Sequence, residues 1–126
     1  MNGKIQLVEY MNGNVVLIPN TVVDELGLID PYFQHSAGDN EYGLRAQRNG
    51  IPVYISSAFV GICDRHEWVC KSMDARYPLR DRLTYLNSPW GARPKESFYL
   101  YRKYKGFWKA AYLWVMAYIR CFFPKK

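Results

Sequence analysis

The chain has 126 residues, of which 49% are hydrophobic and 17% aromatic, so it is long and apolar enough to form a folded domain rather than a disordered segment. Its formal net charge is +6, and the basic excess is C-terminal: residues 1–70 hold four basic and eight acidic side chains, whereas residues 71–126 hold thirteen basic and three acidic ones. Three cysteines without zinc-knuckle or redox spacing, and an N-terminus without a basic run before an apolar core, lead us to expect a reducing, cytosolic setting and no export signal.

The first part of the chain alternates apolar runs with turn residues. Lys4–Tyr10 is a short strand candidate, and the continuous, mostly β-branched run Val15–Pro19 predicts a buried strand that proline stops. Asn20 or Thr21 is suited to cap a short helix, which Gly27 closes. We therefore expect two strands and a helix in this part of the chain.

A second helix is expected over Asn40–Asn49, because Asp39 is a good N-cap and Glu41 lies in the first turn. Glu41 and Arg45 are four residues apart, so they can pair on one face of that helix. Ile51–Ser57 predicts the next strand. Residues 13–62 thus indicate a piece of a layered α/β domain, with too few strands for a complete sheet.

The C-terminal half changes in character. Arg76–Glu96 is interrupted by three prolines and a glycine, which indicates a helical turn followed by an irregular basic loop. Ser97–Lys126 predicts one long aromatic-rich helix, or two helices that join near Gly106. Its apolar run Ala110–Ile119 is too short to span a bilayer. Aromatic residues with basic flanks suit either the membrane interface or contact with a partner domain.

Five motifs stand in a fixed order along the chain: "GNVVLIP", "GLIDPYF", "HSAGDNEYGLRAQRNGIPVY", "GICDRH" and "SPWGARPKESFYLYRKYKG". Together they resemble the C-terminal, acceptor-side part of bacterial family 2 glycosyltransferases, in particular the rhamnosyltransferase-like group that builds cell-surface polysaccharide. The resemblance covers about residues 10–110. It implies a GT-A (Rossmann-like) fold whose N-terminal half binds a nucleotide sugar through an Asp-X-Asp motif and a divalent metal, Mg or Mn. The C-terminal half would bind a saccharide or lipid-linked acceptor.

The resemblance also implies a catalytic base. In "GDNEYGLR", Asp39 lies six residues before Arg45 and falls on the position of the base, Glu41 falls on the second acid, and Gly38 replaces the first acid of the common motif. An inverting transfer needs a carboxylate to take the proton of the attacking hydroxyl, and a helix N-terminus favours that anion. The alternative is that Asp39 is only a helix cap.

Further candidates come from the same motifs. Asn14 lies where the family places an acceptor-facing wall, although an ordinary turn would also explain it. His35, with Glu41 and Arg45, is a candidate for acceptor binding; packing of His35 beside Phe33 is the alternative. Trp90 is a candidate sugar-stacking ring or a loop residue that covers the core. His66 in "CDRH" is a candidate ligand for metal or diphosphate, or a surface histidine.

The donor-binding half has no counterpart in these residues. No Asp-X-Asp motif and no glycine-rich phosphate loop occurs. We therefore expect a partial GT-A domain over residues 1–75, a basic irregular loop over 76–96 and an amphipathic, aromatic-rich helical region over 97–126. We also expect a truncated or split chain that is inactive alone, with an open strand edge and exposed apolar surface.

Three functions stay open. The first is the acceptor-binding and catalytic-base portion of a glycosyltransferase that transfers a hexosyl group, peripheral on the inner face of the cytoplasmic membrane. The nucleotide-sugar donor would bind through the missing half. The second is a non-enzymatic basic and aromatic module for nucleic acid or anionic membrane, with nucleic acid disfavoured by the absence of an RNA-binding motif. The third is a degenerate fragment.

Overall fold

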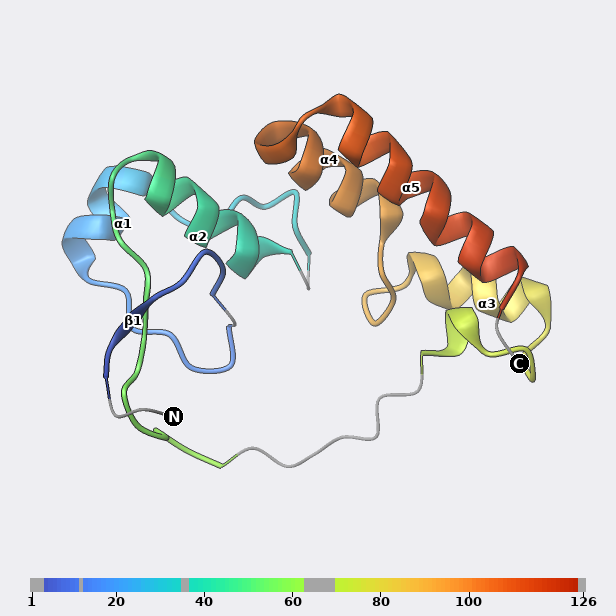
Figure 1. Ribbon diagram of the computed structural model, residues 1–126, viewed down its shortest axis with the longest axis horizontal. Coiled ribbons are helices and arrows are strands. Elements are labelled where there is room, and N and C mark those ends of the chain that lie inside the picture. The colour runs from blue at the N-terminus through green and yellow to red at the C-terminus, as the bar shows by residue number, and fades with distance from the viewer. Residues whose placement is uncertain (1–3, 12, 35–36, 63–69, 125–126) are drawn as a thin grey trace. The chain divides into compact units, whose positions relative to one another are not determined.

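The computed structural model describes residues 4–11, 13–34, 37–62 and 70–124 and is mostly helical with one two-stranded sheet (Figure 1). The chain divides into two compact units. The first unit comprises the described residues within 1–31 and 38–66, and the second comprises those within 32–37 and 67–126. The break expected after residue 75 therefore falls inside the second unit.

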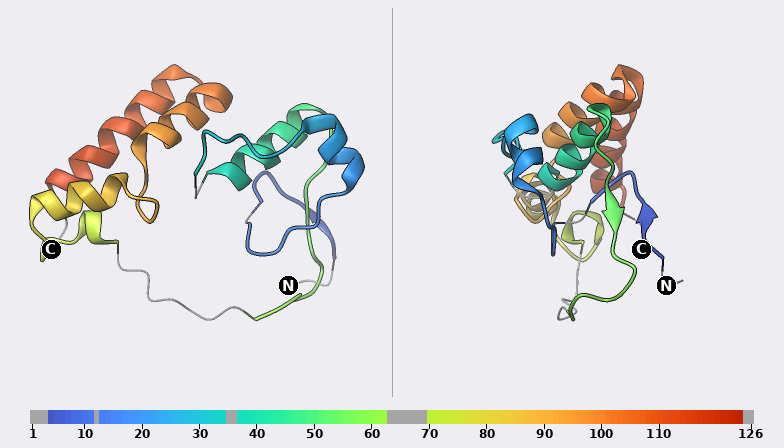
Figure 2. Two further views of the ribbon diagram at one scale, coloured as in Figure 1. Left: turned by 180° about the vertical axis from the view of Figure 1, so that it is seen from behind. Right: turned by 90° about the vertical axis from the view of Figure 1, so that its left-hand side faces the viewer.

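The first unit contains two short strands and two helices. Strand β1 (Gln6–Leu7) pairs antiparallel with β2 (Tyr54–Ile55), with Gln6 opposite Ile55 and Leu7 opposite Tyr54 (Figure 2). The Val8 amide extends the pairing by donating to the carbonyl of Val53 at 2.9 Å. An isolated two-stranded sheet is marginal in water, so this sheet depends on the helices beside it.

Helix α2 (Gly38–Arg48) is the centre of this unit. Tyr42, Leu44 and Ala46 are all buried, and since residues two apart on an α-helix lie on different sides, α2 is covered on more than one side. At Gly43 the helix lies close to the N-terminal segment, since a Cβ atom there would lie 3.4 Å from the Met11 amide nitrogen. The Gln47 side-chain amide donates to the carbonyls of Val8 and Glu9 at 3.0 and 2.7 Å, which ties the β1 segment to α2.

Helix starts differ from the sequence-based expectation in two places. Helix α2 begins at Gly38, so Asp39 lies inside its first turn and is not its N-cap. Helix α1 (Asn20–Leu26) has Pro19 at its N-cap position without a side-chain cap, so neither Asn20 nor Thr21 caps it. Proline fixes the extended conformation needed before a helix, and this preference replaces the expected side-chain cap. Gly27 closes α1 as expected, with φ of 72°.

The prediction of a buried strand over Val15–Pro19 is wrong. These residues form no strand, and Val15 and Leu17 are 72% and 94% exposed. A β-branched run becomes a strand only where another strand pairs with it, and the described sheet contains β1 and β2 alone. The expected strands over Lys4–Tyr10 and Ile51–Ser57 shrink to two residues each for the same reason.

The second unit is a helical cluster. It contains the 3₁₀ turn η1 (Lys71–Met73), α3 (Leu79–Asn87), α4 (Pro94–Lys105) and α5 (Phe107–Phe122). Residues 76–96 thus hold a nine-residue helix where a helical turn and a loop were expected. Prolines flank α3 rather than interrupt it, since Pro78 occupies its N-cap position.

Helices α4 and α5 form a hairpin, which settles the choice between one long helix and two (Figure 1). Gly106 separates them with φ of 92°, a conformation that favours glycine. The core of this unit includes Leu86, Leu100, Ala110 and Cys121. No helix in the described ranges is long and apolar enough to cross a membrane.

Candidate functional site

The Asp39 carboxylate is held by two backbone amides. Its Oδ2 atom accepts a hydrogen bond from the amide of Gly13 at 2.8 Å, and its Oδ1 atom accepts one from the amide of Asn40 at 2.8 Å. A Cβ atom on Gly13 would lie 3.4 Å from Oδ2, so the loop lies in van der Waals contact with the carboxylate. The two bonds fix the side chain at the start of α2, where the helix dipole favours negative charge.

This geometry leaves room for chemistry at Asp39. The side chain is half-buried and keeps part of its surface accessible. A carboxylate has about four lone-pair positions on its two oxygens, and the two amides occupy one on each. An accessible carboxylate with remaining acceptor capacity and a fixed orientation is suited to take a proton from a hydroxyl group.

Arg45 joins α2 to the end of α1. Its Nη1 donates to the Leu26 carbonyl at 2.7 Å, and its Nη2 donates to the Leu28 carbonyl at 2.8 Å. The guanidinium also lies 4.8 Å from the centre of the Tyr42 ring. The hydroxyl of Tyr42 donates to the Gly27 carbonyl at 3.0 Å. Three consecutive carbonyls that α1 leaves unbonded are therefore bound by side chains of α2.

The expected ion pair between Glu41 and Arg45 is confirmed, with Nη2 and Oε2 3.2 Å apart. Glu41 is fully buried, and its partner keeps 22% of its side-chain surface. Both side chains therefore have structural contacts inside the first unit, and Glu41 belongs to the same first turn of α2 as Asp39. Their assignment to acceptor binding stays a prediction.

The remaining candidates are distributed along the chain. Asn14 is exposed and directly follows Gly13, so it adjoins the loop that contacts Asp39. Trp90 belongs to the second unit, between α3 and α4, and is 66% exposed, so it does not cover the core. His35 and His66 lie outside the described residues. The structure thus groups Asn14, Asp39, Glu41 and Arg45 within one unit.

A metal centre is not formed by the side chains that the structure describes. No group of three or more histidine, cysteine, aspartate or glutamate residues gathers there. Divalent metals in proteins are held by several oxygen, nitrogen or sulfur ligands at once. Among the described residues, the side chains around Asp39 therefore do not form a ligand set for a metal, and the role proposed for Asp39 uses none.

A second polar cluster was not visible in the sequence. In the second unit, Glu96 Oε1 lies 2.6 Å from Arg93 Nη1 and accepts the Gln34 amide at 3.4 Å, while Arg93 Nη2 donates to Gln34 Oε1 at 3.0 Å. Glu96 is buried, and its Oε2 has no hydrogen-bond partner among the described residues. Only the three-residue spacing of Arg93 and Glu96 signals part of this cluster, because Gln34 is 62 residues from Glu96.

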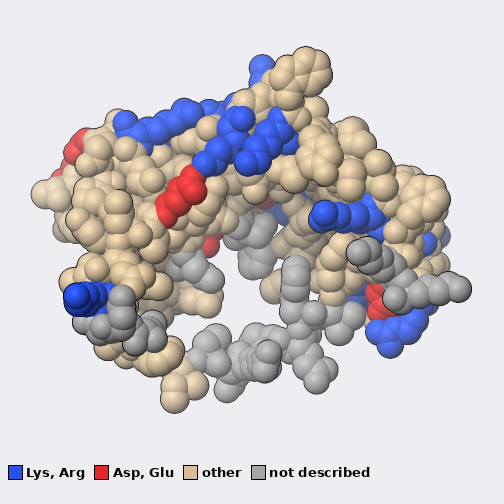
Figure 3. Space-filling model, viewed as in Figure 1, with Lys and Arg blue, Asp and Glu red and all other residues tan. Residues whose placement is uncertain are grey.

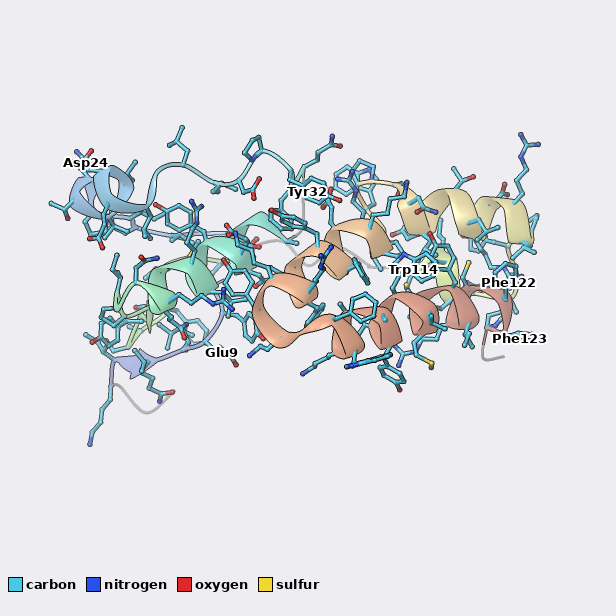
Figure 4. All side chains as sticks on the ribbon, turned by 90° about the horizontal axis from the view of Figure 1, so that it is seen from above. Glu9, Asp24, Tyr32, Trp114, Phe122 and Phe123 are labelled. Carbon is cyan, nitrogen blue, oxygen red and sulfur yellow. The ribbon has the colours of Figure 1, made fainter. Side chains whose placement is uncertain are left out.

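Aromatic rings join the same segment to α4. The rings of Tyr32 and Tyr99 lie 4.5 Å apart, and the Phe33 ring lies 5.7 Å from each of them. Tyr32 is labelled in Figure 4. Aromatic pairs at these separations contribute about 0.5–1.5 kcal/mol beyond their buried area. The segment at residues 32–34 is therefore fixed on α4 by rings as well as by the Arg93–Glu96 pair.

The thiol of Cys121 is buried on α5, and Cys70 is half-buried. Burial raises the pKa of the Cys121 thiol above its ordinary value, with a smaller opposing effect from the Arg82 guanidinium. Arg82 also donates to the Cys121 carbonyl at 2.8 Å. A buried thiol with a raised pKa is a poor nucleophile, so Cys121 is a structural residue.

No protein-family model, curated protein or solved structure matches the chain.

Proposed function

We propose that the chain is the acceptor-binding and catalytic-base portion of an inverting, nucleotide-sugar-dependent glycosyltransferase of the family 2, rhamnosyltransferase-like group. The observation that carries the proposal is the position of Asp39. Its carboxylate is fixed by the amides of Gly13 and Asn40, is partly accessible, and lies at the start of an 11-residue helix. The ordered motifs of the sequence place the base of that family at the same residue.

In the proposed reaction, the acceptor hydroxyl attacks the anomeric carbon of the sugar. Its proton passes to the Asp39 carboxylate as the new carbon–oxygen bond forms. The bond between the anomeric carbon and the nucleoside diphosphate breaks, and its electron pair leaves with the diphosphate. Asp39, now a neutral acid, then releases its proton to water. One carboxylate is sufficient, because a diphosphate leaving group needs no protein acid.

The surface of the first unit is consistent with our proposal that a second domain extends its two-stranded sheet. The β1–β2 pair is only two strands wide, and Val15 and Leu17 of the neighbouring apolar run are strongly exposed. Exposed apolar residues and open strand edges are each typical of an interface. We propose that a nucleotide-sugar-binding half packs here to form a GT-A fold, with any divalent metal bound by that half.

A second candidate function is a basic and aromatic binding module, and the second unit favours it. Residues 70–124 hold eleven basic and three acidic side chains, and several aromatic rings on α5 are exposed. Nucleic acid and anionic membrane both attract such a surface. In the transferase proposal, too, the second unit lies on the inner face of the cytoplasmic membrane. Membrane binding therefore fits both candidates, and they differ in whether Asp39 has a chemical role.

A fusion tests the transferase proposal. The donor half of a related family 2 enzyme is joined by a linker ahead of residue 1, which keeps β1 intact, and release of nucleoside diphosphate is measured with acceptor present. We expect turnover from the fusion and none from the donor half alone. A folded fusion that is no more active than the donor half, with every acceptor class tested, would overturn the proposal.

A further inference from the structure

One face of α5 is a continuous exposed apolar stripe. Successive members are four, three, four and three residues apart, the spacing that keeps side chains on one side of an α-helix. Each is between 43% and 84% exposed. The residues of this stripe, called the α5 stripe below, are Trp108, Tyr112, Val115, Ile119 and Phe122.

The opposite face of α5 belongs to the core of the second unit. Ala110 and Cys121 have no exposed surface, and they lie eleven residues apart, which is three turns of the helix. The Cys121 carbonyl is also bound by Arg82 of α3. The buried face of α5 therefore packs in the core of the second unit, and the α5 stripe points away from that core.

Basic side chains border the stripe. Lys109 and Arg120 are exposed and also lie eleven residues apart, so they share one side of the helix. The last turn of α4 adds Arg102, Lys103 and Lys105, and Figure 3 shows blue side chains gathered around the turn between α4 and α5. No acidic residue occurs anywhere from Ser97 to Pro124. The surface around the stripe thus favours a partner with negative charge.

We infer that α5 docks through this stripe on the surface of an anionic lipid bilayer. The helix has 16 residues and is about 24 Å long, which is shorter than the hydrocarbon core of a bilayer, about 30 Å thick. Since one of its faces belongs to the core of the second unit, the helix would lie along the membrane plane with the stripe toward the lipid. Tryptophan and tyrosine suit the level of the headgroups, where their rings are buried and their polar atoms stay wet. Valine, isoleucine and phenylalanine would reach the acyl region, and Lys109 and Arg120 would meet lipid phosphates.

Two other occupants fit the stripe less well. A second copy of the chain would bring the basic border of one α5 against that of the other, and residues 97–124 offer no acidic side chain to pair with it. A nucleic acid would satisfy the charges and stack on Trp108, but its bases stack on aromatic rings and it offers no extended apolar layer for the aliphatic Val115 and Ile119. An anionic bilayer supplies an apolar layer beneath a layer of negative charge, which matches both the stripe and its basic border.

The inference rests on the membrane location proposed above, but it does not require Asp39 to be a base. Its test therefore uses binding and no turnover. The full chain is mixed with vesicles of phosphatidylcholine containing phosphatidylglycerol, or with vesicles of phosphatidylcholine alone, and the bound fraction is measured by flotation. We expect binding to the anionic vesicles, weaker binding to the neutral ones, and release as salt is raised.

Matched variants locate the contact. Trp108→Gln with Ile119→Gln removes two members of the stripe, whereas Leu17→Gln with Phe59→Gln removes two exposed apolar side chains of the first unit. We expect the first pair to weaken vesicle binding by about tenfold or more and the second to leave it unchanged. Equal vesicle binding by the two double variants would overturn the inference. So would the absence of vesicle binding by the wild type.

Tryptophan fluorescence of the wild-type chain gives a second test, which does not depend on whether the glutamine variants fold. Lipids brominated in the acyl chain quench tryptophan emission only on contact, and Trp108→Phe keeps the apolar stripe. We expect quenching in the wild type and a smaller quenched fraction in Trp108→Phe. Wild-type emission that brominated lipids leave unchanged would contradict membrane docking. A dimer that the stripe variant dissolves, without vesicle binding, would show that a second copy covers the stripe instead.

Discussion

The amide of Gly13 donates a hydrogen bond of 2.8 Å to the carboxylate of Asp39, although the two residues are 26 positions apart. The bond connects the loop after β1 to the first turn of α2, and it sets the direction of the carboxylate. A carboxylate that is fixed before an acceptor arrives needs no reorganisation when the proton moves.

Two substitutions of Asp39 distinguish its structural role, the hydrogen bond to the Gly13 amide, from its proposed chemical role as a base. Asp39→Ala removes both amide contacts and should lower the free energy of unfolding by about 1–2 kcal/mol. Asp39→Asn keeps a carbonyl oxygen for the Gly13 amide and should cost less than half of that. Urea unfolding followed by circular dichroism compares the two variants. Equal losses of stability would mean that the hydrogen bonds contribute nothing beyond the charge.

Among the charged residues of the first unit, Arg45 should be the one whose substitution lowers the free energy of unfolding most. Arg45→Gln removes the bonds to the Leu26 and Leu28 carbonyls and takes the guanidinium away from the buried carboxylate of Glu41. We expect a loss of about 3–5 kcal/mol in the free energy of unfolding. The exposed Arg80→Gln on α3 is the matched control and should change it by less than about 0.5 kcal/mol. Similar losses in both variants would refute the role given to Arg45.

Gly91 should tolerate no side chain. A Cβ atom at this position would collide with the carbonyl oxygen of Tyr85 and lie 2.6 Å from that of Leu86, and both belong to the rigid backbone of α3. Gly91→Ala should therefore destabilise the second unit by about 1–3 kcal/mol or more. Gly61→Ala, where nothing lies within 4 Å of the added atom, is the control. Thermal melting of the two variants gives the comparison, and an unchanged midpoint for Gly91→Ala would contradict the turn described here.

The Cys121 thiol should make stability fall in alkaline solution. Burial raises its pKa in the folded state, so the folded chain holds the thiol proton at a pH where the unfolded chain releases it. The stabilisation is complete below the unfolded value of about 8.5 and is lost as pH rises through the raised folded pKa. Cys121→Ala should flatten this decline in urea midpoints measured across that range. In alkylation followed by mass spectrometry, Cys121 should react more slowly than the half-buried Cys70. A decline that persists unchanged in Cys121→Ala would assign it to other groups, such as Tyr85, whose pKa burial also raises.

Local features of the fold could be predicted from the sequence. Gly27 and Gly106 end helices with positive φ, as their places directly after helix-forming segments indicate. The four-residue spacing of Glu41 and Arg45 predicts the ion pair that the structure contains. These features depend on residues within one turn of each other, so the sequence alone determines them.

Features that depend on distant partners could not be predicted. Val15–Pro19 has the composition of a buried strand, but whether it becomes one depends on a neighbouring strand. The contact between Gly13 and Asp39, and the cluster of Gln34, Arg93 and Glu96, join residues that no periodicity relates. The start of α2 at Gly38 instead of Asn40 moves Asp39 from a cap into the first turn, a shift of two positions that composition does not determine.

The most direct test of the central claim is the rate of sugar transfer by the donor-half fusion with Asp39→Asn, compared with Asp24→Asn. Asp24 is exposed on α1 and controls for loss of a carboxylate elsewhere in the same unit (Figure 4). A general base contributes about 10²–10⁴-fold to a rate, so Asp39→Asn should reduce turnover by that factor while the control keeps it within about twofold. Equal turnover by Asp39→Asn and the unaltered fusion would contradict the account and leave Asp39 with only its structural bonds to Gly13 and Asn40.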